Sequence, residues 1–473
     1  MIPVPGFEGR RIAVFGLGRS GLTAARALKA GGALPVLWDD SVSSRMQAEA
    51  EGFAVEDLTA ADWSGFAALV LSPGAPLTHP KPHWTVDKAN AAGVEIVGDI
   101  ELFARALAAL PEDERPLVVA ITGTNGKSTT TALIGWVLKR AGMTVHVGGN
   151  IGIGVLALPA PTAGAVYVIE VSSYQLDLTR TFAPTIAVLT NISPDHLDRH
   201  GGMEGYVAAK EKIFQSRSTH KYLGVDDPDG RAVLERLRAS RQAVDEVSVA
   251  GPLEGVTGMY LHEGWLAYNV RPTRDAPVER CKIVDLSRAR SLPGRHNAQN
   301  AAFAFLVATD MGIPHETVIE GLLSFPGLAH RMEPVATLGR VRFINDSKAT
   351  NADAARQALS SYERSFWIAG GRAKAGGIDD LEDLFPRVAE AFLIGEAAGP
   401  FAARLSDTPH RVCGDMATAV KAAAEAAAST GRDEVVLLSP AAASFDQYPD
   451  FEARGEAFRA AVLALGATPA SAS

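Results

Sequence analysis

Short apolar runs alternate with longer amphipathic stretches along the first hundred residues. The apolar run over residues 12–15 leads into a glycine turn and then into the alanine-rich stretch "GLTAARALKAGG", which is typical of a helix. Two further apolar runs, "LPVLWDD" and "ALVLSPGAP", each end in polar or turn residues. Strands that alternate with helices are typical of a parallel sheet covered by helices. The pattern therefore predicts an α/β block at the start of the chain.

The same alternation recurs in two later blocks. The second has apolar runs in "PLVVAIT", "AVYVIE" and "TIAVLTN", then a stretch rich in polar loops to about residue 290, then the helical "LPGRHNAQNAAFAFLVATDMG". The third has apolar runs in "VRFIND", "SFWIAGG", "AFLIG" and "EVVLLSP". The charged, proline-bounded "GDIELFARALAALPEDERP" lies at the first boundary and "FPGLAHRME" at the second. We expect an α/β fold with three domains at 1–97, 98–327 and 328–473.

Length and composition agree with a multidomain globular protein. A chain of 473 residues exceeds one ordinary core and suggests about three domains. Hydrophobic residues make up 47% and charged residues 21%, which is an ordinary balance. The net charge of −9, without any basic block, argues against a nucleic-acid partner.

Several features bear on location. The two cysteines, Cys281 and Cys413, lie far apart and form no C-x-x-C motif, which favours a reducing compartment. The N-terminus lacks the charged-then-apolar pattern of a signal peptide. No apolar run approaches the roughly 20 residues that span a bilayer. We expect a cytoplasmic protein without membrane insertion.

The first block carries the motif G-x-G-x-x-G as Gly16, Leu17, Gly18, Arg19, Ser20 and Gly21. After a strand and before a helix, such glycines allow backbone N–H groups to approach a pyrophosphate. Asp39 and Asp40 end the next strand, where a ribose-binding acid would lie. The motif predicts a diphosphate or dinucleotide site, and the alternative is a turn that merely requires glycine.

The second block carries a shortened phosphate loop over residues 122–129. The usual pattern G-x-x-x-x-G-K-[ST] requires glycine where this chain has Ile121. Gly123 and Gly126 can still turn backbone amides toward phosphate oxygens, Lys127 supplies a positive charge, and Ser128 can reach Mg²⁺. This loop predicts a nucleoside triphosphate site. Two such loops in neighbouring blocks indicate an enzyme that combines a diphosphate-bearing substrate with ATP chemistry.

Acidic and polar residues follow two further strands of the second block. Glu170 ends a strongly apolar run, and an ionised carboxylate there is costly unless it is paired or binds a metal ion. Mg²⁺ binding is the simpler explanation and a buried salt bridge is the alternative. The segment after "TIAVLTN" adds a dense polar set, consistent with a metal site, a phosphate site or a hydrogen-bonded loop: Asn191, Asp195, His196, Asp198 and His200. Lys210, on the following helix, has the pattern of a solvated surface lysine.

Taken together, the motifs resemble those of the Mur ligases, the ATP-dependent enzymes that build the peptide stem of bacterial peptidoglycan. The resemblance covers nearly the whole chain in order and rests on "GTNGKST", "GGNIG", "EVSSYQL", "NISPDHLDRH", "YVAAKEKIF", "GRHNAQNA", "GLAHRME" and "NDSKATN". The shortened phosphate loop is the family's own form. "NDSKATN" and "SPAAASFDQYPDFEARG" resemble the members that add D-glutamate.

The resemblance implies the fold and the ligands. The N-terminal domain would be Rossmann-like and bind the uridine-diphosphate substrate, the central one would be a P-loop-type ATPase domain with a parallel sheet, and the C-terminal one would be Rossmann-like and bind the amino acid. It also implies a monomer that joins D-glutamate to UDP-N-acetylmuramoyl-L-alanine through an acyl phosphate.

The resemblance implies site residues position by position. For the uridine substrate these are the six residues 16–21, Asp39 and Asn150. For ATP they are Gly123, Thr124, Asn125, Gly126, Lys127, Ser128, Thr129, Asn297, Asn300, Arg331, Asp346 and Lys374. For D-glutamate they are Lys348, Thr350, Ser439 and Phe445. Two Mg²⁺ ions would be held by Ser128, Glu170, His196 and Lys210.

In the family, the lysine at the position of Lys210 is carbamylated, which replaces a cation by an oxygen-donor anion that Mg²⁺ accepts. The implied catalytic set is Lys127, Glu170, His196 and Lys210, with His196 as a metal ligand and not as the base. The third domain would close over the second, because an acyl phosphate hydrolyses when water reaches it.

Other functions fit parts of the pattern. A folate polyglutamate ligase would lack the first block, and a stem-peptide ligase that adds another amino acid would not be expected to carry "DSKATN". A nicotinamide-dependent oxidoreductase would use residues 16–21 but leave the phosphate loop and Glu170 without a role. In a non-catalytic scaffold, buried acids and glycine loops would lower the stability of the fold without serving a ligand.

Overall fold

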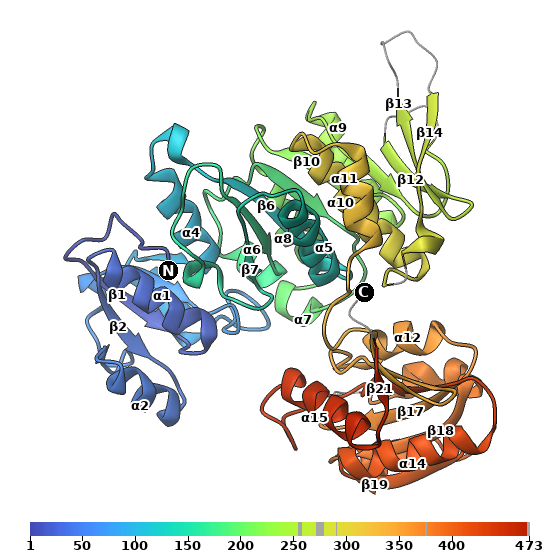
Figure 1. The fold of residues 1–473 in the computed structure, drawn as a ribbon. Helices are drawn as coiled ribbons and strands as arrows, with labels where there is room; N and C mark the ends of the chain where they lie inside the picture. The colour runs from blue at the N-terminus through green and yellow to red at the C-terminus, as the bar shows by residue number, and fades with distance from the viewer. Residues whose placement is uncertain (254–257, 271–278, 290, 374–375, 471–473) are drawn as a thin grey trace. The chain divides into compact units, whose positions relative to one another are not determined.

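The computed structural model describes residues 1–253, 258–270, 279–289, 291–373 and 376–470. It divides into two compact units, Met1–Phe325 and Pro326–Ser473 (Figure 1). Over the described residues, the first unit contains two β-sheets and the second contains one. Helices cover the sheets in each case. The predicted α/β fold with three domains is confirmed.

The first sheet is parallel throughout and has the strand order β3-β2-β1-β4-β5. Its strands are β1 (Arg11–Phe15), β2 (Leu34–Trp38), β3 (Ala54–Val55), β4 (Phe66–Leu71) and β5 (Glu95–Val97). Its helices are α1 (Arg19–Ala30), α2 (Val42–Ala50), η1 (Trp63–Gly65) and α3 (Trp84–Ala91). The order changes direction at β1, so the glycine turn after β1 lies at the switch point where open α/β sheets bind ligands.

The second sheet has the order β14-β13-β12-β11-β10-β9-β6-β8-β7. Its strands are β6 (Leu117–Thr122), β7 (Val145–Gly149), β8 (Val166–Glu170), β9 (Ile186–Leu189), β10 (His220–Gly224), β11 (Asp245–Ser248), β12 (Gly258–His262), β13 (Trp265–Val270) and β14 (Glu279–Asp285). The accompanying helices are α4 (Asp99–Ala108), η2 (Glu112–Glu114), α5 (Lys127–Arg140), η3 (Val155–Ala157), α6 (Ser173–Asp177), α7 (Leu197–His200), α8 (Met203–Glu211), η4 (Lys212–Phe214), α9 (Pro228–Ala239), η5 (Leu286–Arg288), α10 (Gly294–Asp310) and α11 (His315–Leu323).

The expectation of polar loops up to about residue 290 is wrong. Strands β10 to β14 and helix α9 occupy most of that stretch, and β12, β13 and β14 form an antiparallel extension of the parallel sheet. Each of these strands is short. Buried polar residues such as Lys221, Glu246 and Ser248 interrupt the apolar positions of β10 and β11, and most of β14 is exposed. Such strands leave little periodic signal in the sequence.

Helix α4 joins the two sheets of the first unit. Glu101 is fully buried, and its carboxylate accepts hydrogen bonds from the backbone N–H groups of Arg180 at 2.7 Å and Thr181 at 2.9 Å. One hydrophobic cluster runs from Ile2 through the first sheet and the second sheet to Leu237 of α9. Shared burial of this kind explains why these two sheets form one compact unit.

The sheet of the second unit has the order β19-β18-β17-β20-β16-β15-β21, parallel from β19 to β16 and antiparallel at β15 and β21. Its strands are β15 (Glu333–Leu338), β16 (Val341–Asn345), β17 (Ser365–Gly370), β18 (Val388–Ile394), β19 (His410–Gly414), β20 (Glu434–Leu438) and β21 (Thr468–Pro469). One face is covered by α12 (Ala352–Ser360), η6 (Asp379–Arg387) and α13 (Ala398–Arg404), and the other by α14 (Met416–Ser429) and α15 (Phe451–Ala464).

A helix that spans a bilayer must be both long enough and apolar enough to cross it. Among the described residues, no helix meets both requirements.

Candidate active site

Four neighbouring parallel strands of the second sheet, in the order β9-β6-β8-β7, end at the same edge. The phosphate loop follows β6, Glu170 ends β8, Asn191 lies two residues after β9, and Asn150 follows β7. The carboxyl ends of parallel strands are the usual place for ligands in such folds. Topology therefore brings together residues that lie far apart in the sequence, such as Asn125 and Asn191 at a separation of 66.

The two glycines of the phosphate loop have conformations and surroundings that exclude a side chain. Gly123 has a φ of 146°, and an added Cβ would lie 1.9 Å from Thr190 Oγ1. Gly126 has a φ of 81°, and its Cβ would lie 2.5 Å from Asn300 Oδ1. Both positions require glycine for the local turn and for close packing.

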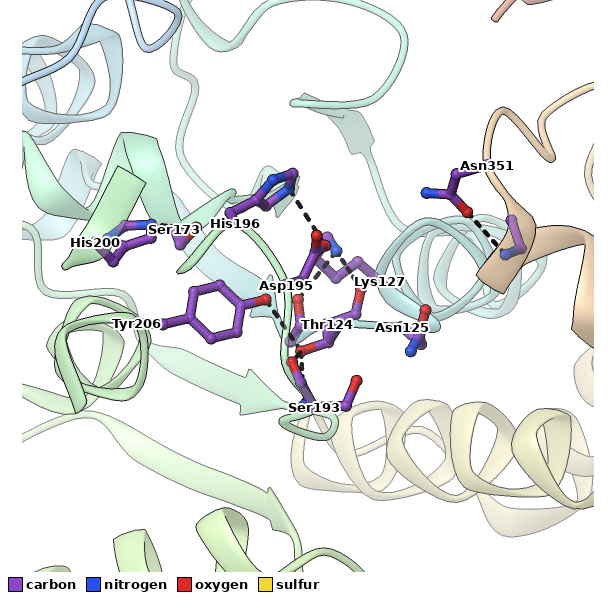
Figure 2. A network of polar contacts seen from close by, with 12 residues as sticks. Thr124, Asn125, Lys127, Ser173, Ser193, Asp195, His196, His200, Tyr206 and Asn351 are labelled. Carbon is purple, nitrogen blue, oxygen red and sulfur yellow. Dashed lines mark hydrogen bonds and ion pairs between the residues drawn. The ribbon is translucent and has the colours of Figure 1, made fainter. Parts of the chain in front are cut away.

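The loop is held from one side by the segment after β9. The backbone N–H of Asn125 donates to Asn191 Oδ1 at 2.9 Å, and Thr190 Oγ1 donates to the Asn125 carbonyl at 2.7 Å. The hydroxyls of Thr124 and Tyr206 lie 3.0 Å apart (Figure 2). Thr190 and Tyr206 were not identified from the sequence. Tyr206 precedes Lys210 by four residues, a spacing that places both on one helix face.

Helix α5 begins at Lys127, and Ser128 and Thr129 are buried in its first turn. The Lys127 ammonium donates to the carbonyls of Gly123 at 3.0 Å and Thr124 at 2.8 Å, so it lies directly over the loop. Unpaired N–H groups and the helix dipole make such an N-terminus attractive to a phosphate. The arrangement matches the predicted triphosphate site.

Helix α10 reaches the same loop. Asn300 is buried, accepts a hydrogen bond from Thr130 Oγ1 at 3.0 Å, and donates to Asn297 Oδ1 at 3.1 Å. Asn297 is half-buried at the start of the helix. The structure therefore brings both predicted adenine-side asparagines together beside α5.

Glu170 is buried at the end of β8. Its Oε1 accepts a hydrogen bond from Asn150 Nδ2 at 2.8 Å, whereas Oε2 is buried without a hydrogen-bond partner among the described residues. The Lys210 ammonium is close enough to interact electrostatically with Glu170, so Lys210 is the partner that the salt-bridge alternative would have. A buried carboxylate oxygen in this state suits a hard cation such as Mg²⁺.

Lys210 is only 2% exposed, so its interpretation from local pattern as a surface lysine is wrong. Its ammonium donates to the Gly123 carbonyl at 2.7 Å and lies 4.6 Å from the centroid of the Tyr206 ring. Burial, with a further contribution from the positive charge of Lys127, lowers the pKa of Lys210 well below its usual value. Helical periodicity could not reveal this, because Lys210 contacts the Gly123 carbonyl, which lies 87 positions away in the sequence.

The polar segment after β9 spreads its residues over different surroundings. His196 is exposed, has a φ of 53°, and lies 3.3 Å from Asp195, while Asp198 is exposed (Figure 2). His200 is buried, with Nε2 3.0 Å from Ser173 Oγ and Nδ1 3.2 Å from Asp177 Oδ2. Only part of the set therefore lies at the strand edge.

The glycine turn after β1 has the predicted geometry. Gly16 has a φ of 87°, an added Cβ at Gly21 would lie 1.8 Å from the Gly16 carbonyl, and a Cβ at Gly18 would meet nothing within 4 Å. The first and third glycines are thus required by packing, whereas space beside the second remains open to a ligand.

Asp39 supports this turn. Its Oδ2 accepts a hydrogen bond from the Leu17 N–H at 2.6 Å, and Arg19 donates to the Gly152 carbonyl at 2.9 Å. Ser20 is half-buried beside Gly21, and Asp40 is exposed. Asp39 therefore lies next to the predicted substrate residues and also orders them.

In the second unit, the predicted residues again follow parallel strands. Asp346 comes directly after β16 and Ser439 directly after β20, and Ser439 Oγ donates to Asp346 Oδ2 at 2.9 Å. Burial raises the pKa of Asp346 to about 7, although Ser439, Arg331 and the Met332 N–H each act to lower it. A buried acid with a strongly shifted pKa at a strand end is typical of functional sites.

The other predicted residues of this unit are more open. Lys348 and Thr350 are half-buried in the loop after β16, where the Lys348 ammonium lies 4.3 Å from the Phe451 ring centroid. Arg331 is half-buried, and Phe445 is 65% exposed in the loop after β20. Lys374 lies outside the described residues.

Comparison with known proteins agrees with this architecture. The family "Mur ligase middle domain" matches residues 121–308, and the family "Mur ligase, glutamate ligase domain" matches residues 330–442. A Caulobacter sp. (strain K31) protein named UDP-N-acetylmuramoylalanine–D-glutamate ligase is 61% identical, with 98% of each chain covered. A protein of the same name from Agrobacterium fabrum is 50% identical, covering 98% of this chain and 97% of its own length.

Solved structures share the fold. UDP-N-acetylmuramate-alanine ligase from Thermotoga maritima superposes with a TM-score of 0.57 at 17% identity, covering 96% of this chain and 99% of its own. MurF ligase from Thermotoga maritima, in complex with ADP, superposes with a TM-score of 0.54 at 16% identity, covering 97% and 96%. From full-length identity and both family matches, the chain belongs to the Mur ligase family.

Proposed function

We propose that this chain is an ATP-dependent, ADP-forming ligase that joins UDP-N-acetylmuramoyl-L-alanine to D-glutamate in peptidoglycan precursor synthesis. The observation that carries the proposal is 61% identity over 98% of the chain to a protein named for this pair of substrates. The two glycine turns at neighbouring sheet edges in the first unit support it, since a uridine diphosphate and ATP each need a phosphate site.

The ATP phosphates would lie on the loop 123–129, with Lys127 as the neutralising charge. Asn297 and Asn300 would contact the adenine, and Arg331, Asp346 and Lys374 would contact ATP from the second unit. The diphosphate of the first substrate would lie on residues 16–21 beside Asp39, with Asn150 near its reacting carboxylate. D-Glutamate would lie among Lys348, Thr350, Ser439 and Phe445.

The residues at the edge of the second sheet suit Mg²⁺, because Glu170 Oε2 is buried without a hydrogen-bond partner and Ser128 lies at the start of α5. His196 and a carbamylated Lys210 would hold a second ion. The buried Lys210 amine supports the carbamate, since the neutral amine is the form that attacks CO₂. Bound Mg²⁺ would neutralise charge on the phosphates during transfer.

The reaction must activate a carboxylate, which is a poor electrophile. The L-alanyl carboxylate would attack the γ-phosphorus of ATP, so that an acyl phosphate forms and ADP leaves. Lys127 would stabilise the negative charge that shifts onto the β-phosphate. The D-glutamate amine would then attack the acyl carbon, and inorganic phosphate would leave as the amide forms.

Three further assignments remain proposals. We propose the domain limits 1–97, 98–327 and 328–473, each range containing one of the three sheets, although the first two sheets lie in one compact unit. A cytoplasmic location is expected because ATP is consumed. A monomer is expected as well.

The experiment is phosphate release by the purified full chain with ATP and Mg²⁺, with one substrate omitted at a time. We expect release only when UDP-N-acetylmuramoyl-L-alanine and D-glutamate are both present. L-Glutamate, L-alanine and diaminopimelate replace D-glutamate in parallel reactions. Release with one of these instead would reassign the amino acid, and release without the uridine substrate would contradict the proposal.

A further inference from the structure

His200 is a buried side chain that touches three helices at once. Its side chain is 1% exposed. Nε2 lies 3.0 Å from Ser173 Oγ and Nδ1 lies 3.2 Å from Asp177 Oδ2, both on α6. Its ring stacks on Tyr174 at 5.4 Å and 14°, and it contacts Tyr206 of α8 at 5.5 Å. Since His200 itself ends α7, one imidazole connects α6, α7 and α8.

Each of these helices is attached to a residue assigned above to Mg²⁺. Helix α6 begins three residues after Glu170, α7 begins directly after His196, and α8 carries Lys210. The three ligands come from separate strand ends and one helix, so their relative positions depend on how these segments pack together.

A direct chain of ring contacts leads from His200 to His196. The Tyr174 ring lies between them, 4.9 Å from His196 and 5.4 Å from His200. The guanidinium of Arg199 covers the Tyr174 ring at 4.5 Å. Tyr174 is therefore fixed on several sides, and His200 supplies its stacked, buried neighbour.

A second path leads from His200 to the phosphate loop. Tyr206, which His200 contacts, places its hydroxyl 3.0 Å from Thr124 Oγ1 (Figure 2). The Tyr206 ring also lies 4.6 Å from the Lys210 ammonium. The same imidazole thus supports both the ligand segments and the loop assigned to ATP.

His196 needs such support. It is a non-glycine residue with a φ of 53°, a left-handed conformation that costs free energy in a residue with a Cβ atom. Because its side chain is 43% exposed, the burial of that side chain contributes little stabilisation to offset this cost. Surrounding packing must hold the turn, and His200 is the buried residue four positions further along the chain.

Ser173, His200 and Asp177 also have the order of contacts found in a Ser-His-Asp triad. However, Ser173 is 2% exposed and the imidazole is buried among aromatic rings. A substrate carbonyl has no access to this hydroxyl, so the arrangement serves packing and orientation and not hydrolysis.

We propose that His200 is a positioning residue that holds the His196, Lys210 and Glu170 segments in the geometry that binds the divalent cation with ATP. The proposal rests on the proposed function, since that function assigns these three residues to the cation. His200 contacts neither the cation nor the reacting atoms and acts through Tyr174, Ser173 and Tyr206.

The test measures cation binding directly. Mn²⁺ is titrated into the full chain with a non-hydrolysable ATP analogue, and free Mn²⁺ is followed by electron paramagnetic resonance. We expect His200→Ala to raise the dissociation constant for Mn²⁺ by about tenfold, as is usual when a group that orients metal ligands is removed. His200→Gln can hydrogen-bond to Ser173 and Asp177 without stacking, so its value should lie between those of the wild type and His200→Ala.

His220 provides a matched control. Its ring stacks on Tyr222 at 4.7 Å and 25°, with Nε2 2.8 Å from Asp245 and Nδ1 paired with Asp310. It thus has similar ring and carboxylate contacts but borders β10, β11 and α10. His220→Ala should leave the Mn²⁺ dissociation constant within twofold of the wild type. Thermal unfolding of every variant identifies any variant that fails to fold. If His200→Ala is unfolded, the Mn²⁺ dissociation constant of His200→Gln decides the test.

The possible results separate the two proposals. Unchanged Mn²⁺ binding in both folded His200 variants, or equal weakening by His220→Ala, would overturn the positioning role, as would a wild type that binds no Mn²⁺. The titration contains neither the uridine substrate nor an amino acid. Weakened binding in His200→Ala together with no phosphate release by the wild type would therefore refute the proposed reaction and support the role of His200.

Discussion

Gly126 begins α5 with a φ of 81°, and a Cβ atom there would lie 2.5 Å from Asn300 Oδ1. Asn300 has little freedom to move away, since it is 1% exposed and hydrogen-bonded to Thr130 and Asn297. Gly142, at the end of the same helix, has a φ of 84° but nothing within 4 Å of an added Cβ. The two glycines therefore share a backbone conformation and differ in their neighbours.

This pair separates backbone strain from crowding. We expect Gly142→Ala to lose about 1 kcal/mol of unfolding free energy from the left-handed backbone alone. Gly126→Ala should lose at least about 1 kcal/mol more, because the methyl group displaces a hydrogen-bonded buried amide. It should also weaken binding of an ATP analogue at least tenfold, measured by calorimetry, whereas Gly142→Ala should not. Equal effects of the two substitutions would show that the Asn300 side chain moves aside at little cost in free energy.

At the scale of elements, helix α15 supports the strand-end loops of the second unit. Arg454 is 1% exposed, and its guanidinium donates to the Ser347 carbonyl at 2.8 Å and the Ala442 carbonyl at 2.9 Å. It also donates to Ser347 Oγ at 3.0 Å. Ser347 lies between Asp346 and Lys348, so one helix orders loops that carry the predicted ATP and D-glutamate residues.

Arg454→Ala should therefore loosen those loops. Because several buried carbonyls would be left unpaired, the free energy of unfolding should fall by about 3 kcal/mol or more. The KM for D-glutamate should also rise, because the loosened loops carry the residues predicted to bind it. Arg459 on the same helix is a control, since it is 31% exposed and pairs with Glu333 and Glu456. Arg459→Ala should cost about 1 kcal/mol or less. Hydrogen exchange in peptides covering 343–350 and 438–446 measures how far each substitution loosens the loops. Equal exchange rates in Arg454→Ala and Arg459→Ala would contradict the specific role of Arg454.

At the scale of the whole molecule, residues assigned to ATP lie on both compact units, Lys127 in the first and Asp346 in the second. An acyl phosphate must be protected from water, so we expect the two units to close around bound ligands. X-ray scattering should give a smaller radius of gyration with an ATP analogue plus the uridine substrate than without them. Identical dimensions in both conditions would contradict closure.

The fold was predictable where strands were apolar and helices were periodic. The runs leading to the glycine turns match β1 and β6, and the helix expected in "GRHNAQNAAFAFLVATD" matches α10. The region of β10 to β14 was missed, because short strands that carry buried polar residues or exposed positions have weak local patterns and are stabilised by their neighbours. The three α/β domains were predictable as well, and burial around α4 joins the first two of them in one compact unit.

The two glycine turns, their flanking strands and helices, and the polar residues at strand ends follow from the sequence alone. These features depend on local backbone conformation and on side-chain periodicity. The burial of Lys210, the contact of Tyr206 with Thr124, and the contacts of His200 with neighbouring helices depend instead on the tertiary structure. Such contacts connect residues far apart in the chain, as with Thr130 and Asn300 at a separation of 170. Burial and electrostatics depend on what packs around a residue, which neighbouring letters in the sequence do not specify.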